Sequence, residues 1–159
     1  MVSIRAARDP EDRAFIAGLN PRLTEVIDAP THSLQEVEQF QAFFTETAWE
    51  QNAGSNAIFI AQDEQGEGIG YVNVREGIDD ILNKPCAYIA LLVLEKAYEG
   101  KGVAQALMQK AEEWAANAGY ERLALDVFAS NTRALSFYES AGFAQETTRL
   151  IKEITPNRP

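Results

Sequence analysis

The fold is decided by the stretch LLVLEKAYEGKGVA, residues 91–104, where an apolar segment runs through a glycine-rich link into a helix pattern. The apolar run at 87–94 predicts a buried strand. Small residues follow it at Gly100, Gly102 and Ala104, and they let a backbone come close to a ligand. Free N–H groups at a helix N-terminus can hold an anion. The stretch therefore predicts a site for a diphosphate.

The remaining chain predicts a mixture of strands and helices around this stretch. Apolar residues recur at helical spacing over 104–118, and Gly119 is a good stop for that helix. Ser33 and Glu36 form the pattern of a capping box before a second helix. The other predicted strands cover 2–7, 57–62, 69–75, 123–127 and 147–154, and the strands at 57–62 and 69–75 form a hairpin.

The glycine-rich link matches neither of the common nucleotide-binding patterns. A Walker loop needs Ser or Thr after its Gly-Lys, whereas Gly102 follows Lys101 here. The dinucleotide pattern fails because Gln105 stands at its third glycine. Taken alone, the link is equally compatible with a tight structural turn.

A second stretch, LDVFASNTRALSFYESAGF at residues 125–143, resembles the second signature of the GNAT N-acetyltransferase superfamily. The Asn, Ala, Phe-Tyr and Gly-Phe of that signature stand at their usual offsets, and the glycine-rich link resembles the family's acetyl-CoA pyrophosphate loop. The resemblance is specific over residues 88–143. It implies an α/β fold with a central, mostly antiparallel, splayed sheet of six or seven strands and helices on both faces.

The resemblance also implies an acetyl-CoA-dependent N-acetyltransferase that moves the acetyl group directly to a primary amine of a small molecule or peptide, with acetyl-CoA as co-substrate and no metal ion. Tyr138 matches the tyrosine that protonates the departing thiolate, a step suited to a phenol. The residues that would bind acetyl-CoA are Leu92, Leu94, Gly100, Lys101, Gly102, Val103, Ala104 and Asn131.

Two positions depart from the family pattern. Glu99 stands where relatives usually have Gln or Arg, which places a negative charge beside the diphosphate site. The glutamate that many members use as general base, near positions 90 or 91, is replaced by Ala90 and Leu91. An amine with a pKa of ~10 still has to lose a proton before it attacks. The candidates left by elimination are His32, Glu25, Asp28 and Asp126.

Composition and charge limit the remaining classes. The chain has 159 residues, a formal charge of −10 and a single cysteine, Cys86. This predicts one domain over 1–159, with no internal disulfide and no cysteine zinc cluster. The charge argues against broad binding of nucleic acid, and no apolar run reaches membrane-spanning length or resembles a signal peptide. A cytoplasmic protein is expected, and a homodimer is compatible with the sequence.

The negative charge is concentrated in one part of the chain. Nine acidic residues and no Lys or Arg lie between Leu23 and Val74. This stretch is either a solvated surface or a wall that attracts a cationic amine acceptor. Two rival functions stay open at this point: a non-catalytic acyl-CoA-binding or sensor domain of the same fold, and an unrelated nucleotide-binding module.

Overall fold

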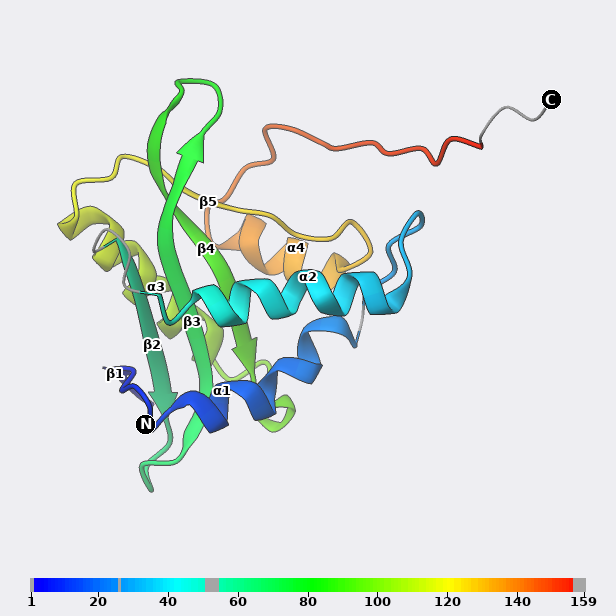
Figure 1. Ribbon diagram of the computed structural model, residues 1–159. Helices are drawn as coiled ribbons and strands as arrows, with labels where there is room; N and C mark the ends of the chain where they lie inside the picture. The colour runs from blue at the N-terminus through cyan, green and yellow to red at the C-terminus, as the bar shows by residue number, and fades with distance from the viewer. Residues whose placement is uncertain (1, 26, 51–54, 156–159) are drawn as a thin grey trace.

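A sheet of five strands forms the centre of the described chain, which comprises residues 2–25, 27–50 and 55–155 of the computed structural model (Figure 1). The strands lie side by side in chain order. Neighbouring strands are antiparallel except β4 and β5, which are parallel. The strands are β1 (Ser3–Ala6), β2 (Asn56–Gln62), β3 (Gly68–Asp79), β4 (Lys84–Leu94) and β5 (Leu123–Leu125).

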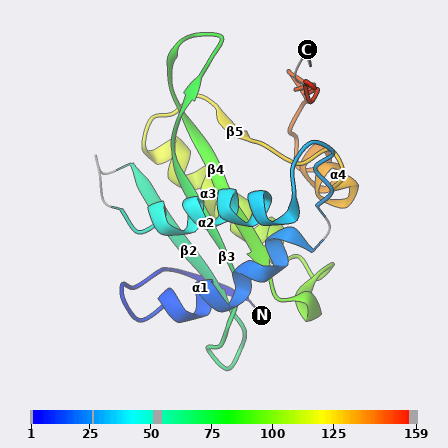
Figure 2. The ribbon, with the colours of Figure 1, turned by 45° about the vertical axis from the view of Figure 1, so that its right-hand side comes forward.

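Helices cover both faces of the sheet. Two of them cross one face, a third lies behind the sheet, and the last lies beside β5 (Figures 1 and 2). The α-helices are α1 (Arg13–Leu19), α2 (Leu34–Thr47), α3 (Val103–Asn117) and α4 (Thr132–Ser140). Two short 3-10 helices, η1 (Asn20–Thr24) and η3 (Lys96–Tyr98), follow α1 and β4.

Each face of the sheet has its own apolar cluster. The α3 cluster contains Ile89 of β4 and Leu107 of α3. The α1–α2 cluster, on the opposite face, contains Leu91 of β4 and Ile16 of α1. All four side chains are at most 4% exposed, so burial on both faces contributes to the stability of the sheet.

A β-bulge in β4 explains why Ile89 and Leu91 face opposite sides although they are two residues apart. Asn73 of β3 pairs with Leu91, and the next residue, Val74, pairs with Ile89, so Ala90 has no partner on β3. One extra residue reverses the alternation of side chains along a strand. The bulge therefore lets a single strand serve both clusters.

The predicted fold class is confirmed, with a sheet flanked by helices on both faces, but the described residues form five strands rather than six or seven. The predicted last strand at 147–154 is wrong, because this segment is extended, exposed and unpaired, with Leu150 90% exposed. Leu150 and Ile154 would share one face of a strand, but this segment pairs with no strand of the described chain, so its apolar residues remain exposed.

Several local predictions are confirmed. Glu36 N–H donates to Ser33 Oγ at 3.1 Å, and Ser33 N–H donates to Glu36 Oε1 at 2.8 Å, which completes the capping box of α2. Gly119 follows α3 with φ at 86°, a conformation that favours glycine. In the part of the chain that the structure describes, no helix is long and apolar enough to span a membrane.

A buried ion pair joins β1 to the start of α1. Arg5 donates from Nη1 and Nη2 to the two carboxylate oxygens of Asp12, at 2.7 and 2.8 Å. The backbone N–H of Arg8 donates to the same carboxylate at 2.6 Å. Asp12 is buried, and the guanidinium of Arg5 holds the pKa of its carboxyl below the ordinary value.

We expect Asp12→Asn to lower the free energy of unfolding by about 2 kcal/mol at pH 7, because a charged hydrogen-bonded pair is broken in a buried place. A carboxyl with a lowered pKa stabilises the fold above its unfolded-state pKa of ~3.9, and this contribution is lost as the pH falls through the folded-state value. In urea unfolding, the free energy of unfolding should therefore be lower for the variant than for wild type at pH 7, and this difference should disappear in acid.

The matched control for this prediction is Asp9→Asn, which removes a more exposed carboxylate paired with Arg13. This variant should change the free energy of unfolding by less than ~1 kcal/mol, as is usual for surface pairs. A cost for Asp12→Asn no greater than that of the control, or a difference that persists in acid, would contradict the assignment.

Candidate active site

The sheet opens on one side of β4 beyond the bulge. β5 pairs with β4 only from Ala87 to Ile89, where Ile89 lies opposite Leu125. Residues 90–94 of β4 have β3 on one side and no strand of the described chain on the other. The two ribbons part at this point (Figure 2). A strand edge carries N–H and C=O groups that can pair with an extended ligand.

The predicted ligand loop follows this open edge directly. Gly100 and Gly102 have φ values of 75° and 82°, in the left-handed region that L residues avoid, and Gly102 is the N-cap of α3. A Cβ atom built on either glycine would meet no atom within 4 Å. The backbone is thus accessible, and the N–H groups of the first turn of α3 have no partner within the helix. This arrangement suits an anion.

Lys101 lies between the two glycines on the exposed surface of the loop. Its Nζ is 5.5 Å from the ring centroid of Tyr98, in the preceding 3-10 helix. Val103 is buried in the α3 cluster and anchors the first turn of α3 behind the loop. The loop therefore presents one cation together with backbone donors.

Glu99 does not leave its negative charge free beside this loop. Its carboxylate accepts hydrogen bonds from Nη2 of Arg22, in η1, and from Nη1 of Arg133, in α4, the latter at 2.7 Å. These partners, Arg22 first, lower the pKa of the Glu99 carboxyl. Arg22 also donates from Nη1 to the carbonyl oxygen of Leu94 at the open edge of β4. Glu99 thus connects η1, the loop and α4.

The side chains of Leu92 and Leu94 pack against the α3 cluster. Only the backbone groups of these two residues can therefore pair with a ligand at the open edge of β4. Among the residues predicted to contact acetyl-CoA, these two and the loop residues 100–104 lie on one continuous path, from the open edge to the first turn of α3.

Tyr138 lies on α4, which begins directly after Asn131. The side chain of Asn131 accepts the N–H of Ala134 at 3.3 Å and caps the helix. The Tyr138 ring contacts Phe137 and Phe143 edge-on, with centroid distances of 5.4 and 5.8 Å. Burial raises the pKa of Tyr138 to about 12, so the phenol is protonated at neutral pH. Its hydroxyl has no hydrogen-bond partner in the described residues.

The four candidate bases have different surroundings. His32 is exposed, with Nδ1 3.1 Å from Thr31 Oγ1. Glu25 pairs with Arg22 at 3.4 Å. Asp126 directly follows β5, and it accepts a hydrogen bond from the hydroxyl of Tyr88 at 2.6 Å.

Asp28, the fourth candidate base, lies in the segment before α2. The backbone N–H of Asp28 donates to Ser130 Oγ at 2.9 Å, which joins the segment before α2 to the segment before α4. Sequence analysis missed Arg22 and Tyr88. Tyr88 is the only hydrogen-bonding side chain in the run 87–94, and this was a signal that could have identified it.

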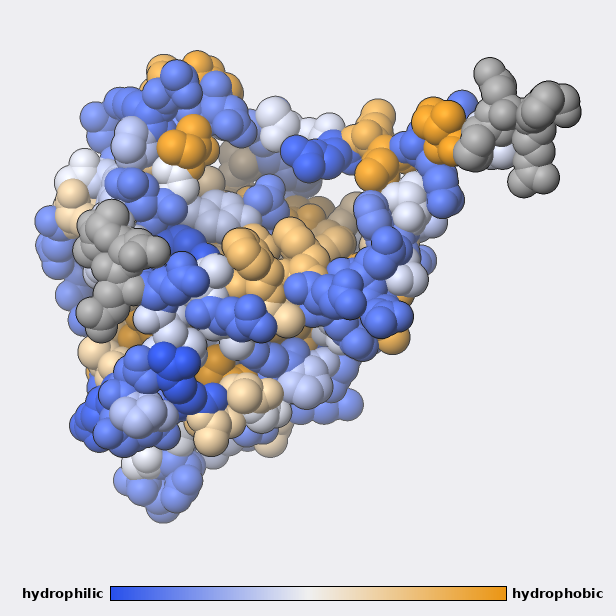
Figure 3. All heavy atoms as spheres, viewed as in Figure 1, coloured by the Kyte–Doolittle hydropathy of each residue, from blue (hydrophilic) through white to orange (hydrophobic). Residues whose placement is uncertain are grey.

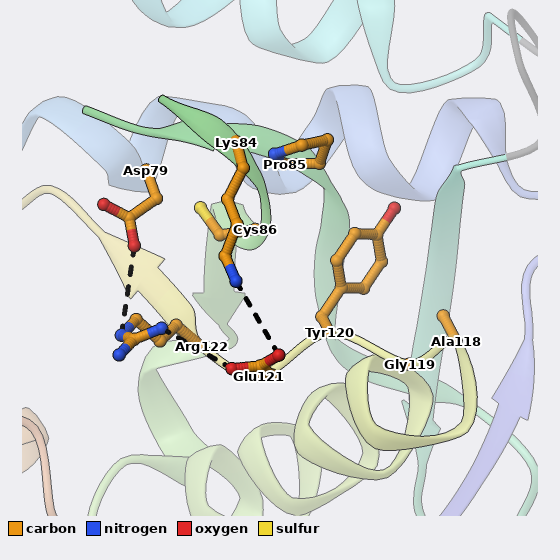
Figure 4. A pocket seen from close by; sticks show the side chains of 9 residues that line it. All are labelled: Asp79, Lys84, Pro85, Cys86, Ala118, Gly119, Tyr120, Glu121 and Arg122. Atoms are coloured by element: carbon orange, nitrogen blue, oxygen red, sulfur yellow. Dashed lines mark ion pairs between the residues drawn. The ribbon is translucent and has the colours of Figure 1, made fainter. Parts of the chain in front are cut away.

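A cavity of about 270 Å³ lies at the other end of β4 and is separate from this site (Figure 4). Ion pairs cross it, from Lys84 to Glu121 at 3.7 Å and from Arg122 to Asp79 at 3.9 Å. Cys86 lines the cavity, and burial raises the pKa of its thiol, which keeps it protonated. A protonated, buried thiol is a poor nucleophile.

Comparison with known proteins agrees with this geometry. A model of the Acetyltransferase (GNAT) family matches residues 22–143. YdgE of Bacillus subtilis (strain 168), named as an uncharacterized N-acetyltransferase, is 36% identical over 92 residues, which are 58% of this chain and 57% of that protein. Aminoglycoside N(6')-acetyltransferase type 1 of Stenotrophomonas maltophilia is 26% identical over 106 residues, 65% of this chain and 69% of that protein.

The fold is shared with a solved structure as well. AAC(6')-Iy in complex with the bisubstrate analogue CoA-S-monomethyl-acetylneamine has a TM-score of 0.68 and 22% identity, and the superposition covers 98% of this chain and 99% of that one. The family match alone extends over more than half of the chain and includes the glycine loop and α4. The protein therefore belongs to the GNAT family of acetyltransferases.

Proposed function

We propose that the protein transfers an acetyl group from acetyl-CoA directly to a primary amine of a small molecule or peptide. The observation that carries this proposal is the open edge of β4 at residues 90–94, which continues into the glycine loop and the first turn of α3. An extended amide-containing arm can pair with the edge while its diphosphate lies on the N–H groups of the loop.

The proposed binding roles follow from these positions. The backbone N–H groups of the loop residues hold the diphosphate, and Lys101 adds a positive charge beside them. The backbone of Leu92 and Leu94 pairs with the pantetheine arm and orients the acetyl carbonyl. Asn131 contacts the arm in addition to capping α4. The residues assigned to acetyl-CoA are Leu92, Leu94, Gly100, Lys101, Gly102, Val103, Ala104 and Asn131.

Tyr138 is the proposed proton donor. Attack of a neutral amine on the thioester gives a tetrahedral oxyanion, which backbone N–H donors stabilise. As the carbon–sulfur bond breaks, the thiolate takes the Tyr138 proton. A hydroxyl without a competing partner supports this role, because the phenol is protonated at neutral pH and its proton is free to pass to the thiolate.

We propose a cationic amine as the acceptor. Glu25 and Asp28 lie in the segment before α2, and the backbone N–H of Asp28 holds this segment against Ser130, before α4. One relative that resembles this chain is named for an aminoglycoside acceptor. Apolar side chains gather over α2 on the same face of the molecule (Figure 3), where Phe40 and Phe43 are exposed. An amine carried on a partly apolar body fits both features.

Thiol release from acetyl-CoA in the presence of a panel of primary amines tests this function. At least one amine should accelerate the release severalfold above hydrolysis. If CoA binds in a calorimetric titration while no amine accelerates release, the protein is a non-catalytic acyl-CoA-binding domain. If ATP binds and CoA does not, the site is a nucleotide-binding module and the proposal is wrong.

Replacing Tyr138 with Phe should lower kcat by about 10²-fold, because it removes a general acid. The dissociation constant of acetyl-CoA should stay unchanged, since the aromatic ring that packs on Phe137 and Phe143 is kept. Steady-state kinetics and calorimetry measure the two quantities.

The matched control is Tyr120→Phe, which removes the hydroxyl of a tyrosine whose ring stacks on Trp114, with 5.8 Å between the ring centroids. This control should keep the kcat of the wild type. A Tyr138→Phe enzyme with unchanged kcat, or one that loses acetyl-CoA affinity instead, would exclude the proton-donor role.

Glu99→Gln should tighten CoA binding about threefold at low salt. The amide oxygen can still accept a hydrogen bond, but the charge that neutralises Arg22 and Arg133 is gone, and both cations then attract the diphosphate. The gain should fade as salt screens these charges. Calorimetric titration at two salt concentrations measures it.

Glu95→Gln is the control for this charge change, since Glu95 is exposed and takes part in none of the ion pairs formed by the described residues. The Glu95→Gln variant should change the affinity for CoA less than Glu99→Gln does. Weaker CoA binding by the Glu99 variant would show that the carboxylate is needed to shape the loop, and that its charge is not the deciding factor.

A further inference from the structure

We propose that Tyr88 and Asp126 act together as the general base that takes the proton from the acceptor amine, an assignment that rests on the acetyl transfer proposed above. The family's usual glutamate is absent from positions 90 and 91, where Ala90 and Leu91 stand. The Tyr88–Asp126 pair is the side-chain hydrogen bond that bridges β4 and the end of β5, at 2.6 Å between Oη and Oδ2.

Tyr88 faces the side of the sheet that α1 and α2 cover. It pairs across the sheet with Arg75 of β3, and directly opposed residues share one face. Arg75 donates to Thr47 Oγ1 at 2.8 Å and to the carbonyl oxygen of Phe44 at 3.0 Å, and both acceptors belong to α2. Tyr88 therefore points toward the α2 side.

The pair lies at the inner end of the gap between β4 and β5. Asp126 is the first residue after Leu125, which forms the last pairing between the two strands. Tyr88 comes two residues before Ala90, the bulged residue where the open edge begins. A pantetheine arm whose diphosphate lies at the glycine loop runs back along 94–91, so its thioester end arrives at this bulge. The reacting carbonyl thus lies next to the pair.

The surroundings keep the proton of Tyr88 in place, while Asp126 is exposed and can exchange a proton with solvent. Burial first, and then Asp126, raise the pKa of the Tyr88 phenol far above its ordinary value. The charged groups that face it are Asp126 and, from β3, Arg75, whose guanidinium is directed to α2. Phe128, two residues after Asp126, contacts Phe40 of α2 edge-on, with 6.4 Å between the ring centroids.

In the proposed reaction, one proton leaves the amine through Tyr88 and another reaches the CoA thiolate from Tyr138. An N–H of the bound ammonium gives its proton to Tyr88 Oη while Tyr88 passes its own proton to Asp126, which frees the nitrogen lone pair. The nitrogen then bonds to the carbonyl carbon, and the π electrons move to the carbonyl oxygen. When they return, the carbon–sulfur bond breaks and the thiolate takes the Tyr138 proton. The second N–H proton of the former ammonium then reprotonates the Tyr138 phenolate. Asp126 releases the first proton to solvent.

The other candidates fit this role less well. Glu25 is engaged by Arg22 at 3.4 Å, and His32 is an exposed loop residue beside the cap of α2. Asp28 uses its backbone to hold Ser130. Asp126 alone among the four is joined by a hydrogen bond to a side chain of β4.

The test compares Asp126→Asn and Tyr88→Phe with wild type, using ethylamine and its mono-, di- and trifluorinated analogues as acceptors. Each fluorine lowers the basicity of the amine, so the least basic one is already neutral at neutral pH. With ethylamine, each variant should lose about 10²-fold in kcat/KM, the usual worth of a general base. With the trifluorinated amine, the loss should shrink to a few-fold. Acetyl-CoA affinity should not change.

The matched controls are Glu76→Gln and Tyr120→Phe, which remove the charge and the hydroxyl, respectively, of a second phenol–carboxylate hydrogen bond of 2.8 Å away from the gap. Both should keep wild-type kinetics. Wild-type rates in Asp126→Asn, or a loss of equal size for all four amines, would overturn the assignment while leaving acetyl transfer intact. A wild-type protein that binds acetyl-CoA but acetylates no amine would instead overturn the proposed function, and the base with it.

Discussion

The extra residue Ala90 in β4 is the constraint on which the site depends. It reverses the side-chain alternation, so that Ile89 and Leu91 enter clusters on opposite faces. It also marks the point where pairing with β5 ends and the strand edge becomes free. A regular strand would either stay paired to β5 or turn its apolar residues into solvent. The bulge thus produces an open edge inside a buried sheet, at the cost of one unpaired position.

Several of the acidic residues that give the chain its negative charge belong to turns and helix ends. Of the nine acidic residues between 23 and 74, Asp63, Glu64 and Glu67 belong to the turn between β2 and β3, where Asp63 accepts two backbone N–H groups. Glu36 completes the capping box of α2. These four shape turns and helix ends. The carboxylates that remain near the gap are fewer, and Asp126, outside the acidic stretch, is the one in contact with β4.

Much of this fold could be read from the sequence because its signals are local. The capping box, the helix 104–118 and the two glycines of the loop each depend on residues within one turn of one another. The bulge and the contacts of Glu99 could not be predicted, since Arg22 and Arg133 approach from segments 77 and 34 residues away. The strand expected at 147–154 failed because a strand also needs a neighbouring strand to pair with, and the local residue pattern does not show whether one is present.

In the mechanism proposed above, Tyr88 and Tyr138 serve opposite steps. Both phenols have a raised pKa through burial, so neither ionises at neutral pH. The difference lies in the partner. The proton of Tyr88 is directed to a carboxylate, so this phenol can take a proton only by passing its own to Asp126. Tyr138 has no acceptor in the described chain, and its proton is free to meet a thiolate. Hydrogen bonding, rather than residue type, separates the proposed acid from the proposed base.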